Sequence, residues 1–371
     1  MIKLENVTKV FANQETPAVK NLNLHIKKGE VCVLVGPSGC GKTTTMKMIN
    51  RLVEPTEGTV YIDGKDTSTV NPIELRLNIG YVIQEIGLFP HLTIAENVAT
   101  VPREKKWPAE RIRQRVEELL NLVGLDPQVY GNRKPADLSG GQRQRVGVAR
   151  AMAADPPILL MDEPFGAVDP ITRAKLQNEF LRIQEQMQKT IVFVTHDIDE
   201  AIKMGDKIAV MRKGELVQYS TPEELLSAPA NDFVAKLVGK NRSIKRLHLI
   251  RVDRVLGSNH NVPVVKKNTP VRKLEELVDG SEIGAVLVVD ERDRLLGLAS
   301  AVDIREAGGG VAGDIYQPLP NTIGVGATLS DALSVMLNYG EGYVAVVDKA
   351  NQLTGIITLG FLLGLVKEDA A

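Results

Sequence analysis

The chain has 371 residues, 43% of them hydrophobic and 25% charged, and its formal net charge is −1. This composition is typical of a globular protein, and the net charge gives no general attraction to nucleic acid or anionic membrane. No run approaches the roughly 18 apolar residues of a membrane span. At roughly 150 residues per domain, the length predicts two or three domains.

The cysteines and the N-terminus indicate a compartment. The two cysteines, Cys32 in an apolar strand pattern and Cys40 in a glycine-rich loop, do not suggest a structural disulfide, which fits a reducing cytosol. Residues 1–6 lack the apolar core of a signal peptide. We expect a cytoplasmic protein whose link to a membrane comes through a partner.

The first 52 residues predict strands followed by a phosphate-binding loop. Alternating polar and apolar residues over 1–30 predict antiparallel strands, and the apolar run 31–35 predicts a buried strand. A glycine-rich loop and a helix over 43–52 follow. The loop consists of Gly36, Pro37, Ser38, Gly39, Cys40, Gly41, Lys42, Thr43 and Thr44. Its glycines let backbone N–H groups point at phosphates, with Lys42 reaching the β- and γ-phosphates and Thr43 binding Mg²⁺.

Two further strands end in polar residues. Apolar spacing over 104–123 predicts an amphipathic helix, and 158–161 and 191–195 predict buried strands, so the alternation favours a sheet covered by helices. Asp162 ends the first of these strands, where a carboxylate is costly unless it serves a metal. Glu163 then reads as the general base for the attacking water, or alternatively as a structural carboxylate. His196 follows the second strand, where it is either a residue of the site or a structural histidine.

The stretch Leu138–Gln142 (LSGGQ) lies between the phosphate loop and the acidic strand end. With these motifs, residues 1–240 resemble the ATP-binding cassette (ABC) ATPases. The resemblance implies an α/β P-loop fold, with a mixed sheet core, antiparallel strands and a helical subdomain at 85–137. It also implies that Ser139, Gly140, Gly141 and Gln142 bind the γ-phosphate of an ATP held by a second chain. We therefore expect a homodimer with ATP and Mg²⁺ between its subunits.

The resemblance assigns further residues of the cassette. It implies that His196 contacts the γ-phosphate, and that Gln84 senses Mg²⁺ and the γ-phosphate and moves with a membrane partner. Phe11 stands where the family has an adenine-stacking aromatic, usually tyrosine; a core phenylalanine is the alternative. Asp169 matches the family's interface aspartate. The four residues Gly166–Asp169 stand where the family more commonly has Ser-Ala-Leu-Asp.

Residues 85–98 are similar to those of bacterial importer ATPases. Together with the C-terminal half described next, they resemble the importers of quaternary-amine osmoprotectants: glycine betaine, carnitine, choline or proline betaine. The resemblance implies transmembrane permease subunits, an extracytoplasmic binding protein and a peripheral position on the inner face of the membrane. An importer ATPase for another substrate, and a soluble ABC ATPase without transport, are the alternatives.

The C-terminal half contains an internal repeat. Residues 240–254 carry six basic residues, and because no aromatic residue interleaves them we expect a linker at 241–254 and no nucleic-acid site. Beyond it, residues 285–290 align with 343–348 at an offset of 58. Each unit is expected to form a helix, two strands and a helix, and two such small units should pack together. Residues 255–371 resemble tandem CBS domains of α+β type, at about 255–307 and 312–367.

Tandem CBS domains bind adenine nucleotides between their repeats, with a Ser/Thr and, three residues later, an Asp. Ser300 and Asp303 fit this pattern, whereas Thr358 is followed by Phe361 at the aspartate position. The resemblance leaves three roles open for this half: binding cyclic di-AMP or another adenine nucleotide, sensing ionic strength, or dimerisation. Asp303 is alternatively a helix cap.

Overall fold

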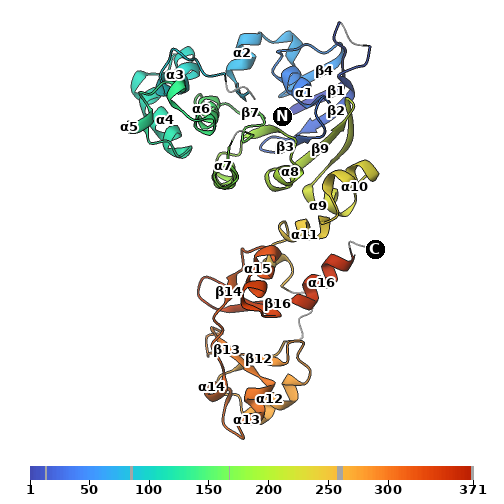
Figure 1. Cartoon of the computed structure of the whole chain (residues 1–371), viewed down its shortest axis with the longest axis vertical. Helices are drawn as coiled ribbons and strands as arrows, with labels where there is room; N and C mark the ends of the chain where they lie inside the picture. The colour runs from blue at the N-terminus through green and yellow to red at the C-terminus, as the bar shows by residue number, and fades with distance from the viewer. Residues whose placement is uncertain (13–14, 84–86, 167, 257–261, 369–371) are drawn as a thin grey trace. The chain divides into compact units, whose positions relative to one another are not determined.

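A computed structural model describes residues 1–12, 15–83, 87–166, 168–256 and 262–368 (Figure 1). The chain divides into two compact units, Met1–Val238 and Gly239–Ala371. Each unit has its own sheets and its own hydrophobic clusters.

The first unit is built on a six-stranded sheet in the order β10-β9-β3-β8-β7-β6. All neighbouring pairs are parallel except β10 with β9. Central strands β3, β7 and β8 are buried along their whole length, as expected for a parallel sheet covered on both faces. The strands are β3 (Val31–Val35), β6 (Ile79–Val82), β7 (Ile158–Asp162), β8 (Thr190–Thr195), β9 (Lys207–Arg212) and β10 (Glu215–Ser220).

The order of these strands positions the predicted site. Strands β3, β7 and β8 are parallel neighbours, so their carboxyl ends meet at one edge of the sheet. The phosphate loop follows β3, Asp162 is the last residue of β7, and His196 follows β8. Ligands of open parallel sheets bind at this edge.

A second sheet and a set of helices complete the sheet-containing part of the first unit. The second sheet is antiparallel, in the order β2-β1-β4-β5, and buries Ile2, Leu4 and Val7 against the core of the first sheet. Its strands are β1 (Ile2–Lys9), β2 (Val19–Ile26), β4 (Glu57–Ile62) and β5 (Lys65–Asp66). The helices here are α1 (Lys42–Ile49), α2 (Pro72–Leu77), α7 (Pro170–Met187), α8 (Ile198–Met204), α9 (Pro222–Ser227) and α10 (Asp232–Val238).

A group of helices forms the helical region of this unit (Figure 1). They are α3 (Ile94–Glu104), α4 (Ala109–Leu122), α5 (Pro127–Tyr130) and α6 (Gly140–Met152). The helix expected over 104–123 begins only at Ala109, because Pro108 is its N-cap and Lys106 takes a left-handed backbone (φ 54°) that ends the preceding helix. Helix α6 lies close to β6: a Cβ on Gly80 would approach the Ala151 carbonyl oxygen to 2.2 Å.

The second unit repeats one fold at the expected offset of 58. Strands β11 (Val264–Lys266), β12 (Ala285–Val289) and β13 (Leu295–Ser300) correspond to β14 (Thr322–Gly324), β15 (Tyr343–Val347) and β16 (Leu353–Thr358). The short parallel first strands, β11 and β14, were not part of the sequence prediction. The helices are α11 (Arg242–Leu247), α12 (Val271–Val278), α13 (Ala301–Glu306), α14 (Ala312–Ile315), α15 (Leu329–Tyr339) and α16 (Leu359–Glu368).

The two repeats pack against each other with approximate twofold symmetry. Arg294 of one repeat pairs with Gln352 of the other, which are equivalent positions. A hydrophobic cluster with Leu287 and Ala345 joins the two sheets. The segment expected as a linker, 241–254, contains α11 and contributes Leu247 to the core of the second repeat. It is thus folded onto this unit.

Candidate nucleotide-binding and hydrolysis site

The phosphate loop has a backbone that only glycine tolerates at two positions. Gly36 (φ 152°) and Gly41 (φ 105°) lie against other backbone segments, where an added Cβ would come within 2.2 Å of the Met211 carbonyl oxygen and 2.5 Å of the Ala18 carbonyl oxygen, respectively. At Gly39 (φ 76°), by contrast, a Cβ would meet nothing within 4 Å. The loop is therefore anchored at both ends and open in the middle, which suits the approach of a ligand to its backbone.

Lys42 lies beneath this loop and is only 7% exposed. Its ammonium donates to the carbonyl oxygens of Gly36 (2.6 Å) and Pro37 (3.0 Å), with a weak contact to the Cys40 Sγ at 3.7 Å. The first turn of α1 follows directly, with Gly41 as an N-cap that has no side-chain acceptor. A buried cation beside a helix N-terminus is a favourable setting for phosphate.

Two expected metal ligands are neighbours. The Thr43 hydroxyl donates to the Asp162 carboxylate at 3.2 Å. Burial raises the pKa of Asp162 above its usual value, and the charge of Glu163 adds to this, whereas the Thr43 hydrogen bond and the nearby Lys47 and Lys42 oppose it. A buried carboxylate that lacks a full counter-charge next to a hydroxyl oxygen fits Mg²⁺, which prefers oxygen ligands. Gln84, the third predicted metal ligand, lies outside the described residues.

Glu163 and His196 face each other across the edge of the sheet. The Glu163 carboxylate lies 3.2 Å from the Nδ1 of His196, and their side chains are 22% and 65% exposed. Glu163 has a left-handed backbone (φ 48°) and its N–H donates to the Val194 carbonyl oxygen at 3.0 Å. A non-glycine residue in this conformation is strained, and such strain concentrates at functional sites.

The LSGGQ residues form the beginning of α6. Ser139 is an exposed N-cap that accepts from the Gln142 N–H at 3.3 Å, and Gln142 accepts in turn from the Ser139 N–H at 2.9 Å. A Cβ at Gly140 would meet nothing within 4 Å. The signature thus presents a helix N-terminus and a hydroxyl to open space, which fits an anion supplied from outside the chain.

Two more predicted residues have clear positions. Phe11 is 37% exposed and so is not part of the core, and the Lys9 ammonium lies over its ring, 5.4 Å from the centroid. Asp169 is the N-cap of α7 and accepts from the Thr172 N–H at 3.0 Å.

Sequence reasoning missed three polar residues of the helical region. Buried Asn97 donates to and accepts from Phe89, closing the loop before α3. Arg150 donates to the Gly87 carbonyl oxygen at 2.7 Å. Buried Gln144 donates to the Glu163 carbonyl oxygen at 2.8 Å. Gln144 was detectable as a polar residue one turn before Val148, on the buried face of α6.

In the second unit, Ser300 and Asp303 form a capping box. Ser300 is the N-cap of α13, and its N–H donates to the Asp303 carboxylate at 2.9 Å. The Ser300 hydroxyl holds the pKa of Asp303 below its usual value. Asp303 is therefore an ionised acceptor at the start of a helix.

Thr358, the equivalent of Ser300, is only 2% exposed. Its hydroxyl donates to the carboxylate of Glu282, in the first repeat, at 2.7 Å. It also accepts from the N–H of Phe361 at 3.2 Å. In the second repeat, a carboxylate from the opposite repeat takes the place beside the hydroxyl that Asp303 has in the first.

Comparison with known proteins identifies the family. Residues 19–166 match the family model for ABC transporters, and residues 252–310 and 312–360 match CBS domains. The chain is 47% identical to the glycine betaine/carnitine/choline transport ATP-binding protein OpuCA of Bacillus subtilis, over 100% of this chain and 97% of that protein. The chain belongs to the ATP-binding proteins of ABC transporters. It is an ATPase that uses ATP and Mg²⁺, and it carries tandem CBS domains.

Further relatives agree with this assignment. The osmoprotectant import ATP-binding protein OsmV of Salmonella typhimurium is 46% identical over 98% of this chain and 95% of its own length. The dimeric, post-hydrolysis structure of the ABC cassette MJ0796 bound to ADP and Pi has a TM-score of 0.56 and 41% identity, covering 60% of this chain and 99% of that one. The expected ABC cassette fold is confirmed. Within the described residues, no helix of this ABC protein is long and apolar enough to cross a bilayer.

Proposed function

We propose that this chain is the ATP-hydrolysing subunit of an importer of quaternary-amine osmoprotectants, such as glycine betaine, carnitine, choline or proline betaine. The observation behind this proposal is the full-length likeness to OpuCA and OsmV, which includes the CBS half. An importer ATPase for another substrate remains the alternative. We place the chain on the inner face of the cell membrane, peripheral to its permease.

An uptake experiment tests the substrate. Source cells lacking this chain receive either the wild type or the Glu163→Gln variant, and uptake of radiolabelled glycine betaine, carnitine and choline is measured. The proposal expects the wild type to restore uptake of at least one of the three and the variant to restore none. If the wild type restored growth of these cells but uptake of none of the three compounds, the importer would carry a different substrate.

The site residues divide the work of hydrolysis. The loop amides and Lys42 would hold the phosphates, and Thr43 and Asp162 would hold Mg²⁺, whose charge would neutralise that of the phosphates. The Glu163 carboxylate orients the attacking water and accepts its proton, as its accessible position at the sheet edge allows. His196 lies beside Glu163 and contacts the γ-phosphate.

A second copy of the chain completes each site in this proposal. The exposed Ser139 hydroxyl and the free side of Gly140 provide donors at a helix N-terminus for the γ-phosphate held by the partner. These contacts exist only when two chains close on ATP, so hydrolysis changes the distance between subunits. The extracytoplasmic binding protein acts only indirectly, through the permease.

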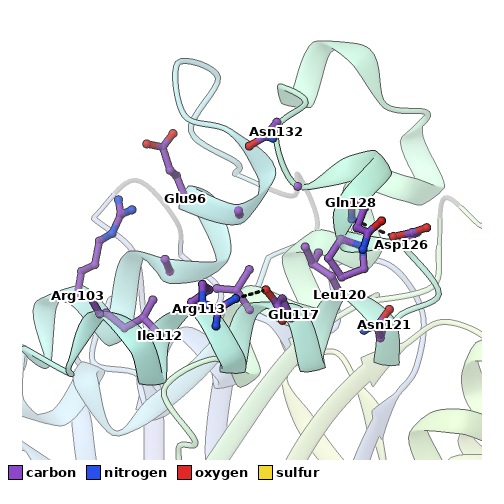
Figure 2. A pocket seen from close by; sticks show the side chains of 16 residues that line it. Glu96, Arg103, Ile112, Arg113, Glu117, Leu120, Asn121, Asp126, Gln128 and Asn132 are labelled. Atoms are coloured by element: carbon purple, nitrogen blue, oxygen red, sulfur yellow. Dashed lines mark hydrogen bonds and ion pairs between the residues drawn. The ribbon is translucent and has the colours of Figure 1, made fainter.

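A groove on the helical region is the proposed docking surface for the permease. It has a volume of about 800 Å³ and is lined by α3, α4, the start of α5 and adjoining loop residues (Figure 2). Ala99, Val116 and Leu120 form an apolar floor. Charged side chains surround it, namely Glu96, Arg103, Arg113, Glu117 and Asp126. An apolar floor with a charged rim suits an amphipathic cytoplasmic helix of the permease.

Filling this groove should weaken the complex. Ala95 lies on α3 and lines the groove, so Ala95→Trp should place an indole where the partner helix docks. We expect copurification with the permease to fall about 30-fold, as expected when a central anchor worth about 2 kcal/mol is blocked. Gln114→Trp, on α4 but outside the groove, is the control. Equal copurification of both variants would remove the groove from the interface.

For the CBS half, we propose that the first repeat recognises an adenine nucleotide, with cyclic di-AMP as the leading candidate and regulation of transport as the result. The ionised Asp303 beside the Ser300 hydroxyl supports this. In the second repeat, the Glu282 carboxylate beside Thr358 would repel a phosphate. Nucleotide binding is therefore favoured at the cleft that contains Ser300 and Asp303. Ionic-strength sensing and dimerisation are the competing roles. We also propose an ATPase part at 1–240 and a CBS part at 255–371, onto which the segment 241–254 folds.

Calorimetric titration of the full chain tests the CBS proposal. The Lys42→Met background suppresses nucleotide binding by the cassette, and cyclic di-AMP, AMP and ATP are titrated separately. We expect saturable cyclic di-AMP binding at about one ligand per two chains, as a symmetric site between two copies requires. Asp303→Ala should weaken it. No heat with any of the three ligands would leave Asp303 with only its capping role.

A further inference from the structure

A side chain of the signature helix holds the backbone of the proposed base. Gln144 lies in α6, five residues after Ser139, and is only 3% exposed. Its amide donates to the carbonyl oxygen of Glu163 at 2.8 Å. The Gly166 N–H donates to the same oxygen at 3.1 Å. The contact thus connects the helical region to the residue that directly follows β7.

The conformation of Glu163 makes this contact consequential. A left-handed backbone is unfavourable for an L-residue, so the conformation of Glu163 must be imposed by its surroundings. The Glu163 N–H is fixed by Val194, of β8, and its carbonyl oxygen by Gln144 and Gly166. The direction of the carboxylate follows from this backbone conformation. Losing one of the three contacts loosens the group that must orient water.

Helix α6 links this contact to the signature. Its N-cap is Ser139, its second turn carries Gln144, and its last turn packs against β6, where Gly80 leaves room for the Ala151 carbonyl oxygen. A helix of this length moves as one body. A phosphate that draws the N-terminus of α6 toward a partner chain also moves the Gln144 amide.

We propose that Gln144 is a positioning residue that ties the backbone of Glu163 to the signature helix, so that hydrolysis depends on where α6 lies. The proposal rests on Glu163 being the base. Gln144 touches neither phosphate nor water in this account. It acts by keeping the Glu163 carboxylate aligned in the closed dimer.

Gln144→Met tests the proposal, because methionine has a similar length and no amide donor. We expect kcat for ATP hydrolysis to fall about 10- to 100-fold, the range for misplacing a catalytic group by about 1 Å. The KM for ATP and the thermal midpoint should change little, since the phosphate contacts and the Gly166 bond remain. Gln184→Met is the matched control: it loses amide bonds to the Gly29 and Lys189 carbonyl oxygens, away from the site. Its kcat should stay within about twofold of wild type.

A double-mutant comparison separates positioning from a general structural role. In single-turnover hydrolysis, Gln144→Met should cause no further loss in a Glu163→Gln background, because the group it aligns is already gone. A further loss as large as in the wild-type background would overturn the proposal. So would a wild-type kcat for Gln144→Met alongside an inactive Glu163→Gln. An active Glu163→Gln would instead show that the base is wrong. If Gln144→Met does not fold, Gln144→Asn, which keeps a shorter amide, is measured for the same split between kcat and KM.

Discussion

Replacing Glu163 with Gln is expected to lower ATP hydrolysis by about 10²- to 10⁴-fold, the usual contribution of a general base. The amide keeps the size of the side chain and can contact His196, but it cannot accept a proton from water. Because Glu163 is not among the residues that hold the phosphates, ATP binding should persist and a closed, ATP-loaded dimer should accumulate. Phosphate release and gel filtration with Mg-ATP measure both effects.

Glu179→Gln provides the matched control for this substitution. Glu179 is an exposed carboxylate on α7 that pairs with Arg182 at 3.0 Å, so its loss should leave hydrolysis near the wild-type rate. Hydrolysis near wild type in Glu163→Gln would assign the base elsewhere. A dimer that fails to accumulate, with hydrolysis lost, would separate the chemistry from the closure step.

Lys42→Met is expected to weaken ATP binding about 10- to 100-fold, because hydrogen bonds to a charged group contribute about 1.5–3 kcal/mol each. The methionine retains the buried stem but removes the cation that the phosphate loop encloses. The affinity is measured by calorimetry with ATP and Mg²⁺. Lys28 is exposed and precedes the amino end of β3, whereas the phosphate loop follows the carboxyl end. The Lys28→Met variant should therefore bind ATP like the wild type. Equal affinity of both variants would contradict the placement of the phosphates at Lys42.

The sequence predicted those parts of the structure that follow from a local pattern of apolar and polar residues. The three predicted buried strands are observed as β3, β7 and β8, and because the structure makes them parallel neighbours, Gly36, Asp162 and His196 lie at one edge of the sheet. The CBS repeat was visible because its hydrophobic pattern recurs at a fixed offset. In both cases, a local pattern determines the arrangement.

Features that depend on contacts between distant segments could not be predicted in the same way. The bond from Gln144 to the Glu163 carbonyl oxygen joins α6 to a turn 19 positions away and leaves no periodic signal. The pairing of Thr358 with Glu282 crosses between repeats, where equivalent positions carry different residues. Strands β11 and β14 have only three residues each and exist because they pair with β12 and β15.

Complementation between two inactive variants tests the central claim, that each ATP site is shared by two chains. Lys42→Met removes the phosphate cation, and Gly140→Asp places a carboxylate at the signature, where the structure leaves room for a side chain. At an ATP concentration that saturates the wild type but not Lys42→Met, each variant alone should be inactive. A mixed dimer retains one intact site, so equal mixing should restore up to about a quarter of wild-type hydrolysis if subunits exchange freely. No recovery at any mixing ratio, with both variants folded and exchanging subunits, would contradict a site built from two chains.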